Sequence, residues 1–101
     1  MTPEDKVKNK ITAFLEEEKA KGLLYYDRRQ AVTLSYHKGV PDIWFCMNGK
    51  HYEVEVKKPG GTRSTLQIKY EQIFKNMNVA YACVDSVDAF KKFFNEEKSL
   101  S

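Results

Sequence analysis

Residues 42–58 read DIWFCMNGKHYEVEVKK, and this stretch decides the fold of the chain. The pair Asn48-Gly49 favours a two-residue type I′ turn, because both residues tolerate the positive φ angles that this turn requires. Residues 42–47 form an apolar run on one side of the turn, and residues 51–58 alternate with a period of two on the other. We therefore predict an antiparallel hairpin centred on this turn.

An amphipathic helix is predicted at the start of the chain. Thr2 and Pro3 are typical of a helix N-terminus, and Gly22 is typical of the residue that follows a helix. We expect the helix to run from about Pro3 to Lys21, with residues 16–18 on its solvated side. Its apolar face consists of Val7, Ile11, Phe14 and Leu15.

Two more helices are predicted after the hairpin. Ser64 and Gln67 form a capping box for a helix that ends near residues 76–78, and Ser86 caps a final helix. The last residues, 98–101, are expected to fray. The apolar positions of these two helices are Leu66, Tyr70, Ile73, Phe74 and Met77 in the first, and Val87, Phe90, Phe93 and Phe94 in the second.

Two other segments have the composition of strands. Residues 23–36, LLYYDRRQAVTLSY, predict one long strand or two short ones, and residues 79–84, VAYACV, predict a short buried strand. Because a helix separates residues 51–58 from residues 79–84, these strands need a crossover connection and are parallel if paired. The predicted class is α/β (α+β), with a mixed sheet flanked by helices.

Length and composition favour one small intracellular domain. A chain of 101 residues fits a single domain, residues 1–101, and no segment approaches the roughly 18 apolar residues of a membrane span. The first residues lack the apolar core of a secretory signal. Cys46 and Cys83 lie in apolar runs without metal-ligand spacing, so we expect reduced core cysteines and a cytoplasmic location.

Basic residues are concentrated in the middle of the chain. The formal charge of the whole chain is +3, with 17 Lys and Arg against 14 Asp and Glu. Between Arg28 and Lys75 the chain has nine basic and four acidic residues, a charge of +5, whereas the two flanks together carry −2. A basic central segment favours a polyanionic partner such as nucleic acid.

The hairpin carries the residues that are candidates for catalysis. Asp42 begins one strand, and Glu55 and Lys57 lie two positions apart on the other. Side chains alternate along a strand, so Glu55 and Lys57 share one face, and folding at the turn brings this face beside Asp42. Two carboxylates and an ammonium are therefore expected to converge.

Such a cluster suits metal-dependent hydrolysis of phosphodiesters. Carboxylate oxygens of Asp42 and Glu55 are ligands that Mg²⁺ or Mn²⁺ accepts, and the metal would lower the pKa of a bound water. Lys57 would orient that water or stabilise the transition state. Each motif alone has a simpler interpretation, since Glu-x-Lys is common on exposed strands and Pro-Asp commonly opens turns.

The order of the motifs is more specific than any one of them. Gly39-Val40-Pro41-Asp42 precedes an apolar strand and a hairpin, Glu55-Val56-Lys57 follows, and Gln67 lies at the start of the next helix. This arrangement resembles the PD-(D/E)XK nuclease superfamily and, within it, the VRR-NUC family, over most of the chain. The resemblance implies a restriction-endonuclease-like αβββαβ core.

The resemblance also implies roles for individual residues. Asp42 and Glu55 would be metal ligands together with the Val56 main-chain carbonyl, Lys57 would be the catalytic lysine, and Gln67 would lie near the scissile phosphate. Glu4 in the first helix fits the position from which many members reach the metal waters, although an acid in a first helical turn is favoured anyway. Gln67 also has a second expected role, as the reciprocal cap of Ser64.

Stand-alone members of this size are similar to phage proteins that act on branched DNA as homodimers. We therefore expect DNA as partner, four-way junctions among the substrates, and a bacterial or phage-infected cell as the location, with no membrane or nucleotide cofactor involved. Two copies would supply two sites for symmetric incisions. A phosphate-binding rim is expected from Arg28, Arg29, Lys38, Lys58, Arg63 and Lys69.

Three further residues leave alternatives open. Glu53 lies on the side of Glu55, where family strands usually carry an apolar residue, so it is either solvated at the start of the strand or adds negative charge to the site. His37 and His51 are expected to be exposed or hydrogen-bonded loop residues rather than general bases. The alternative functions are a catalytically inactive nucleic-acid-binding module and a protein-interaction domain.

Overall fold

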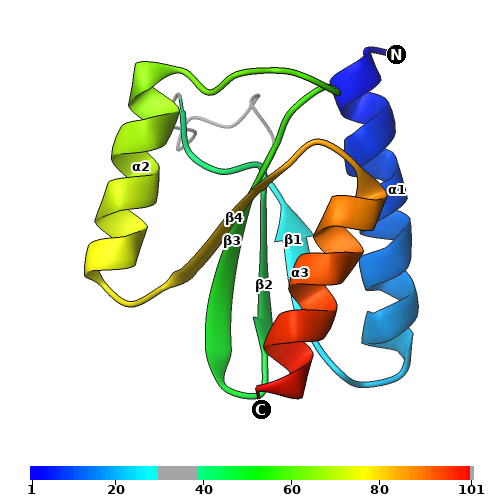
Figure 1. Ribbon diagram of the computed structural model, residues 1–101. Coiled ribbons are helices and arrows are strands. Elements are labelled where there is room, and N and C mark those ends of the chain that lie inside the picture. The colour runs from blue at the N-terminus through cyan, green and yellow to red at the C-terminus, as the bar shows by residue number, and fades with distance from the viewer. Residues whose placement is uncertain (30–38, 101) are drawn as a thin grey trace.

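The structure is a computed structural model that describes residues 1–29 and 39–100. Three helices and a four-stranded mixed sheet make up this part of the chain, as the sequence predicts (Figure 1). The sheet order is β1-β2-β3-β4, with antiparallel pairs β1/β2 and β2/β3 and a parallel pair β3/β4. The elements are α1 Pro3–Ala20, β1 Tyr25–Arg28, β2 Ile43–Met47, β3 Lys50–Val56, α2 Thr65–Asn76, β4 Ala80–Val84 and α3 Val87–Ser99.

The predicted hairpin is confirmed, with its turn at the expected residues. Asn48 and Gly49 have φ angles of 54° and 78°, which are the two positive values of a type I′ turn. Met47 pairs directly with Lys50 across the turn. This register places Ile43 opposite Val54, and it therefore sets Asp42 beside Glu55 at the other end of the hairpin.

Helix α1 begins as predicted and ends one residue early, at Ala20. The Thr2 hydroxyl accepts a hydrogen bond from the Asp5 N–H at 3.0 Å, and Gly22 takes the left-handed conformation with φ 78°. The prediction that residues 16–18 are all solvated is wrong for Glu18. This side chain is buried and its carboxylate pairs with Lys21 at 2.9 Å.

One face of the sheet is covered by α1 and α3, and the hydrophobic core lies between them and the strands (Figure 1). Ring packing dominates this core, with Phe90 and Phe94 of α3 fully buried against Phe45 of β2. Helix α3 extends to Ser99, so the expected fraying does not begin at residue 98. The buried apolar residues of α1 are Val7, Ile11 and Leu15.

Helix α2 lies on the opposite side of the sheet from α1 and α3, against β4 (Figure 1). Its capping box is present as predicted, and although its apolar positions follow the helical period, none of its residues is buried. Tyr70 and Phe74 are half-buried and stack on one another with ring centroids 6.3 Å apart. Leu66, Ile73 and Met77 are exposed.

The structure corrects the expected burial of the two cysteines and describes only part of the predicted strand at residues 23–36. Cys46 and Cys83 are free thiols, but both residues are exposed, because they point away from the sheet face that α1 and α3 cover. Of residues 23–36, the structure shows β1 at Tyr25–Arg28, and the remainder from residue 30 lies outside the described residues. No described helix is long and apolar enough to cross a membrane.

Candidate active site

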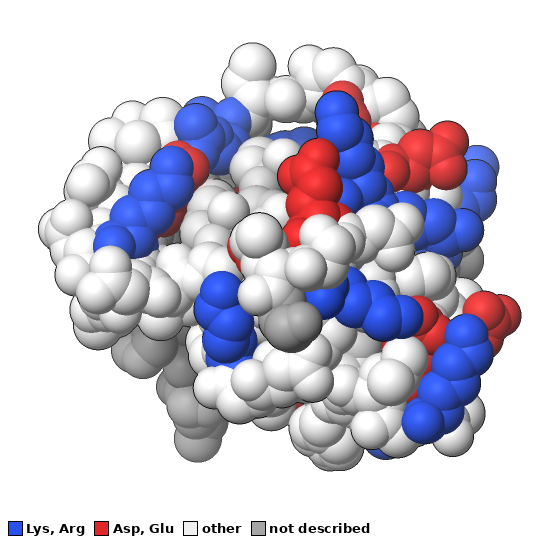
Figure 2. Space-filling view, turned by 60° about the horizontal axis from the view of Figure 1, so that its bottom comes forward, with Lys and Arg blue, Asp and Glu red and all other residues white. Residues whose placement is uncertain are grey.

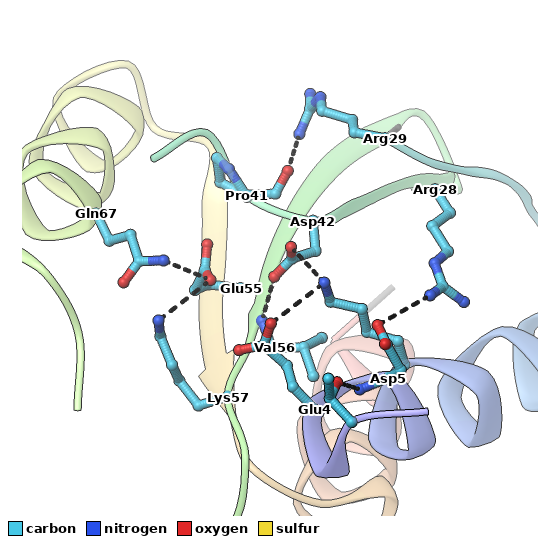
Figure 3. A network of polar contacts seen from close by, with 12 residues as sticks. Glu4, Asp5, Arg28, Arg29, Pro41, Asp42, Glu55, Val56, Lys57 and Gln67 are labelled. Atoms are coloured by element: carbon cyan, nitrogen blue, oxygen red, sulfur yellow. Dashed lines mark hydrogen bonds and ion pairs between the residues drawn. The ribbon is translucent and has the colours of Figure 1, made fainter. Parts of the chain in front are cut away.

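Asp42 and Glu55 come together at the end of the hairpin remote from its turn (Figure 3). The Asp42 Oδ2 accepts a hydrogen bond from the Val56 N–H at 2.8 Å, which orients the carboxylate toward β3. Pro41, which precedes Asp42, is buried and fixes the backbone where β2 begins. Val56 lies on β3 between Glu55 and Lys57, at the position that the motif requires.

Glu55 is the most buried group of the cluster, with only 2% of its surface exposed. Its Oε2 accepts a hydrogen bond from the Gln67 Nε2 at 2.9 Å and lies 3.8 Å from the Lys57 Nζ (Figure 3). Its Oε1 is buried and has no hydrogen-bond partner among the described residues. Burial, followed by repulsion from Asp42, raises the pKa of Glu55 well above its usual range, although attraction to Lys57 opposes this.

Gln67 performs the capping role predicted for it and also contacts Glu55. Its Oε1 accepts a hydrogen bond from the Ser64 N–H at 2.8 Å, and its N–H donates to the Ser64 hydroxyl at 3.2 Å. The other end of the same amide, Nε2, donates to Glu55. The capping box therefore fixes the amide orientation that supports the Glu55 carboxylate.

Gly39 begins the Gly-x-Pro-Asp motif and is required by its surroundings. It has a φ angle of 88°, which only glycine adopts without strain. A Cβ atom at this position would lie 2.5 Å from the Leu66 Cγ in α2. The motif glycine therefore lets the segment before Asp42 pass close to the helix that carries Gln67.

Lys8 is a site residue that the sequence analysis missed. Its Nζ lies 3.1 Å from the Asp42 Oδ1 and 3.4 Å from the Glu4 Oε2, and only 16% of its side chain is exposed. Burial alone would lower the pKa of Lys8, but attraction to Asp42 and Glu4 raises it above the ordinary value. The spacing of four residues from Glu4 was a signal for this pairing along α1.

The donor set fits a divalent metal ion in part. The Glu55 Oε1 is buried and has no hydrogen-bond partner among the described residues, and a hard cation bound there would supply the missing interaction. Asp42 provides a second carboxylate beside it. Glu4 reaches the cluster through Lys8. Within residues 1–29 and 39–100, no group of three His, Cys, Asp or Glu side chains converges on one position, so main-chain oxygens and waters would complete the coordination.

Glu53 is neither solvated nor a free negative charge in the site. It is 1% exposed, and its two oxygens accept hydrogen bonds from the Arg29 guanidinium at 2.5 and 3.0 Å. Its Oε2 also lies 2.5 Å from the His51 Nε2. The interpretation of Glu53 as a solvated carboxylate is therefore wrong, and His51 is a strand residue in β3 rather than a loop residue.

Arg29 connects this buried carboxylate to the segment that carries Asp42. Its guanidinium donates to the Pro41 carbonyl at 2.9 Å, and its N–H donates to the Asp42 carbonyl at 2.8 Å (Figure 3). Both bonds hold the backbone at the point where the chain enters β2. Arg29 is thus a positioning residue for Asp42, with Glu53 as its counter-ion.

Some of the residues expected to bind phosphate are paired with other side chains of the protein, and others are exposed. Arg28 donates to the Asn9 Oδ1 at 2.7 Å and lies near Asp5, and Arg63 is paired with Glu71. Lys58 and Lys69 are exposed, whereas Lys38, like His37, lies outside the described residues. On the face shown in Figure 2, Lys and Arg side chains alternate with Asp and Glu and form no continuous basic patch.

No family model matches the chain, and neither a curated protein nor a solved structure matches it. The function of the site is therefore inferred from its own residues. The strongest indications are the burial of Glu55, the unpartnered Oε1, and the convergence of Lys57 and Gln67 on the same carboxylate.

Glu55→Gln is expected to stabilise the metal-free protein. Between the usual pKa of a glutamate and the raised pKa of Glu55, the folded chain holds a proton that the unfolded chain has lost, so the free energy of unfolding falls as pH rises. Glutamine does not ionise. In urea denaturation with EDTA, the variant should exceed wild type by about 1–3 kcal/mol at about pH 8, and by less at about pH 5.

Glu96→Gln is the matched control, because Glu96 is exposed on α3. This control should follow the pH dependence of wild type. Equal pH dependence in wild type and Glu55→Gln would show that burial of the Glu55 carboxylate does not destabilise the metal-free fold.

Proposed function

We propose that this protein is a Mg²⁺- or Mn²⁺-dependent DNA endonuclease that acts on branched DNA such as four-way junctions. The observation that carries the proposal is the convergence of Asp42, Lys57 and Gln67 on Glu55, whose second oxygen is buried and has no partner in the described part of the chain. The helix and strand order supports it, because α1-β1-β2-β3-α2-β4 is the αβββαβ order that the resemblance to VRR-NUC nucleases implies.

The residues divide the work of phosphodiester hydrolysis between them. Asp42 and Glu55 would hold the metal with the Val56 main-chain carbonyl, and the metal would supply a water of lowered pKa and neutralise charge on the phosphate. Lys57 is close enough to the site to stabilise negative charge as it develops on the phosphate oxygens. Gln67 keeps the Glu55 carboxylate in place.

The test is cleavage of labelled flap, fork, four-way junction and duplex DNA by the wild-type chain. With Mg²⁺ or Mn²⁺ we expect cleavage of at least one branched substrate, and with EDTA we expect none. Absence of cleavage on all four substrates with both metals would overturn the proposal.

One observation favours the alternative of a catalytically inactive nucleic-acid-binding module. The Lys8 ammonium lies 3.1 Å from the Asp42 Oδ1, so a cation of the protein itself already neutralises this carboxylate. If Lys8 holds this place permanently, the site binds no metal and the protein binds DNA without cutting it. Metal affinity therefore separates the two functions.

Lys8→Met is expected to bind Mn²⁺ about tenfold more tightly than wild type, because the change removes a positive charge that repels the metal and competes for Asp42. Isothermal titration calorimetry measures the affinity directly. Lys10→Met, at an exposed position of the same helix, should leave it unchanged, and Lys8→Arg should stay close to wild type. If wild type binds Mn²⁺ and Lys8→Met binds it no better, Lys8 is not a competitor.

We also propose that the protein acts as a homodimer. One centre of this size cuts one strand, whereas a two-fold dimer presents two centres to the two strands of a symmetric junction. Light scattering at micromolar concentration should give twice the 11.8 kDa mass of the chain. A monomeric mass would contradict paired incisions and leave the single-site chemistry unaffected.

A further inference from the structure

Three aromatic rings lie in a row on the sheet face that carries the candidate active site. Tyr25 of β1, Trp44 of β2 and His51 of β3 are neighbours across the strands, with ring centroids 6.0 Å apart for the first pair and 5.6 Å for the second. Tyr25 is 56% exposed, and 40% of the His51 side chain is exposed. Helices α1 and α3 cover the other face (Figure 1).

The ring at the β3 end of this row is held rigidly. The His51 Nε2 lies 2.5 Å from Glu53, which is itself fixed by Arg29, and the His51 Nδ1 lies 3.6 Å from the Cys46 Sγ. Trp44 stacks on the His51 ring with an interplanar angle of 26°. A ligand that stacks on these rings would therefore meet a surface that is already ordered, at a small entropic cost.

The register of the sheet connects the rings with the active site. Asp42 and Trp44 are two positions apart on one strand, as are Glu53 and Glu55 on the next, so all of them point to the same face. His51 lies four positions from Glu55, about 13 Å along the strand, which is about four nucleotides at the spacing of a stacked strand. A nucleic-acid strand that reaches the site can therefore also reach the rings.

Cations lie at both ends of this path. The Lys19 Nζ lies 4.9 Å from the Tyr25 ring centroid at one end, and Lys57 and the exposed Lys58 lie at the other. Of the carboxylates between them, Glu53 is neutralised by Arg29, whereas Asp27, opposite Trp44, is exposed on the same face. Aromatic rings flanked by cations are the usual means of binding single-stranded nucleic acid, since every base has a face that stacks.

We propose that Tyr25, Trp44 and His51 form a stacking platform for the unpaired single strand of a flap or fork, the branched DNA substrates that carry one. This inference rests on the proposed function, because it names the part of the substrate that the same sheet face holds. Stacking of unpaired bases would favour flaps and forks over continuous duplex DNA and over four-way junctions, in which the bases are paired and stacked on one another. The platform would thereby contribute selectivity without reading base edges.

The test uses the fluorescence of Trp44, which is the only tryptophan of the chain. Wild-type protein in EDTA is titrated with oligothymidine and with a blunt duplex of the same number of phosphates. We expect quenching by the single strand and much less by the duplex. In anisotropy measurements with labelled oligothymidine, Tyr25→Ser should bind about tenfold more weakly, and Trp44→Phe, which keeps a ring, should bind close to wild type.

Met77→Ser is the matched control, because Met77 is 58% exposed and lies at the end of α2. It should bind oligothymidine as wild type does. The inference is overturned if Trp44 fluorescence does not respond to the single strand, or if Tyr25→Ser and Met77→Ser bind equally well. It is also overturned if Tyr25→Ser changes only the oligomeric mass, since the rings would then contact a second copy.

These outcomes are separate from those of the proposed function, because the titration contains no metal and involves no cleavage. Quenching by the single strand without any cleavage by the metal-loaded protein would support the platform and contradict the nuclease. Cleavage of branched DNA without a change in Trp44 fluorescence would support the nuclease and contradict the platform.

Discussion

Asp42→Asn is expected to lower the rate of DNA cleavage by about 10³-fold, because it removes one of the two carboxylates that would hold the metal. The amide oxygen of asparagine can still accept the Val56 N–H, so the fold around the site should be preserved. Cleavage of a labelled junction under single-turnover conditions measures the rate, and calorimetry measures Mn²⁺ affinity. Both cleavage and Mn²⁺ binding should be lost, whereas DNA binding in EDTA should be retained.

Lys57→Ala provides the comparison that assigns the roles. Lys57 lies 3.8 Å from Glu55, and its ammonium group would stabilise charge on the phosphate, so the rate of cleavage by this variant should fall by about 10²–10³-fold. Because an ammonium group is not a metal ligand, the variant should keep its Mn²⁺ affinity. Asp88→Asn, in the exposed first turn of α3, should cleave as wild type does. Cleavage by Asp42→Asn at the wild-type rate would contradict the assignment of the site.

Local signals in the sequence predicted most of the architecture. The Asn48-Gly49 turn, the capping box of α2 and the serine cap of α3 each involve residues within a few positions of one another, and each is present. Because the turn sets the register of the hairpin, it also predicted that Asp42 and Glu55 would meet. A site built on one hairpin is therefore accessible to prediction from spacing alone.

Predictions that depended on the surroundings of a residue were less successful. The apolar positions of α2 follow a helical period, but the period does not show how much of that face a neighbouring element covers. Among the described helices and strands, β4 is the one that packs most against α2, and it leaves Ile73 and Met77 exposed. The apolar neighbours of Cys46 and Cys83 likewise do not indicate which face of the sheet is open. Both cysteines occupy the face without α1 and α3.

Charged partners far apart in the sequence were also not predictable. Lys8 reaches Asp42 from α1, and Arg29 reaches Glu53 from the end of β1. Pairings of this kind depend on how α1 and β1 are placed against the hairpin. The burial of Glu53 was the least predictable feature, since a carboxylate is almost never buried without a partner and its partner is 24 positions away.

Arg29→Met is expected to lower the free energy of unfolding by about 3–5 kcal/mol, because it leaves the buried Glu53 carboxylate without its main counter-ion. The same change removes the bond to the Pro41 carbonyl, so cleavage should fall as well. Urea denaturation measures the loss. Arg28→Met is the control, since the partly exposed pair of Arg28 with Asp5 should be worth about 1 kcal/mol or less.

A second variant distinguishes the loss of a counter-ion from the loss of packing. Arg29→Met combined with Glu53→Leu removes both charges. A protein whose buried ion pair is replaced by apolar groups of similar volume is often as stable as the original. The double variant should therefore regain most of the lost stability. It should not regain cleavage, because the bond that holds Pro41 beside Asp42 stays absent. Recovery of both properties would show that Arg29 only neutralises Glu53 and does not position Asp42.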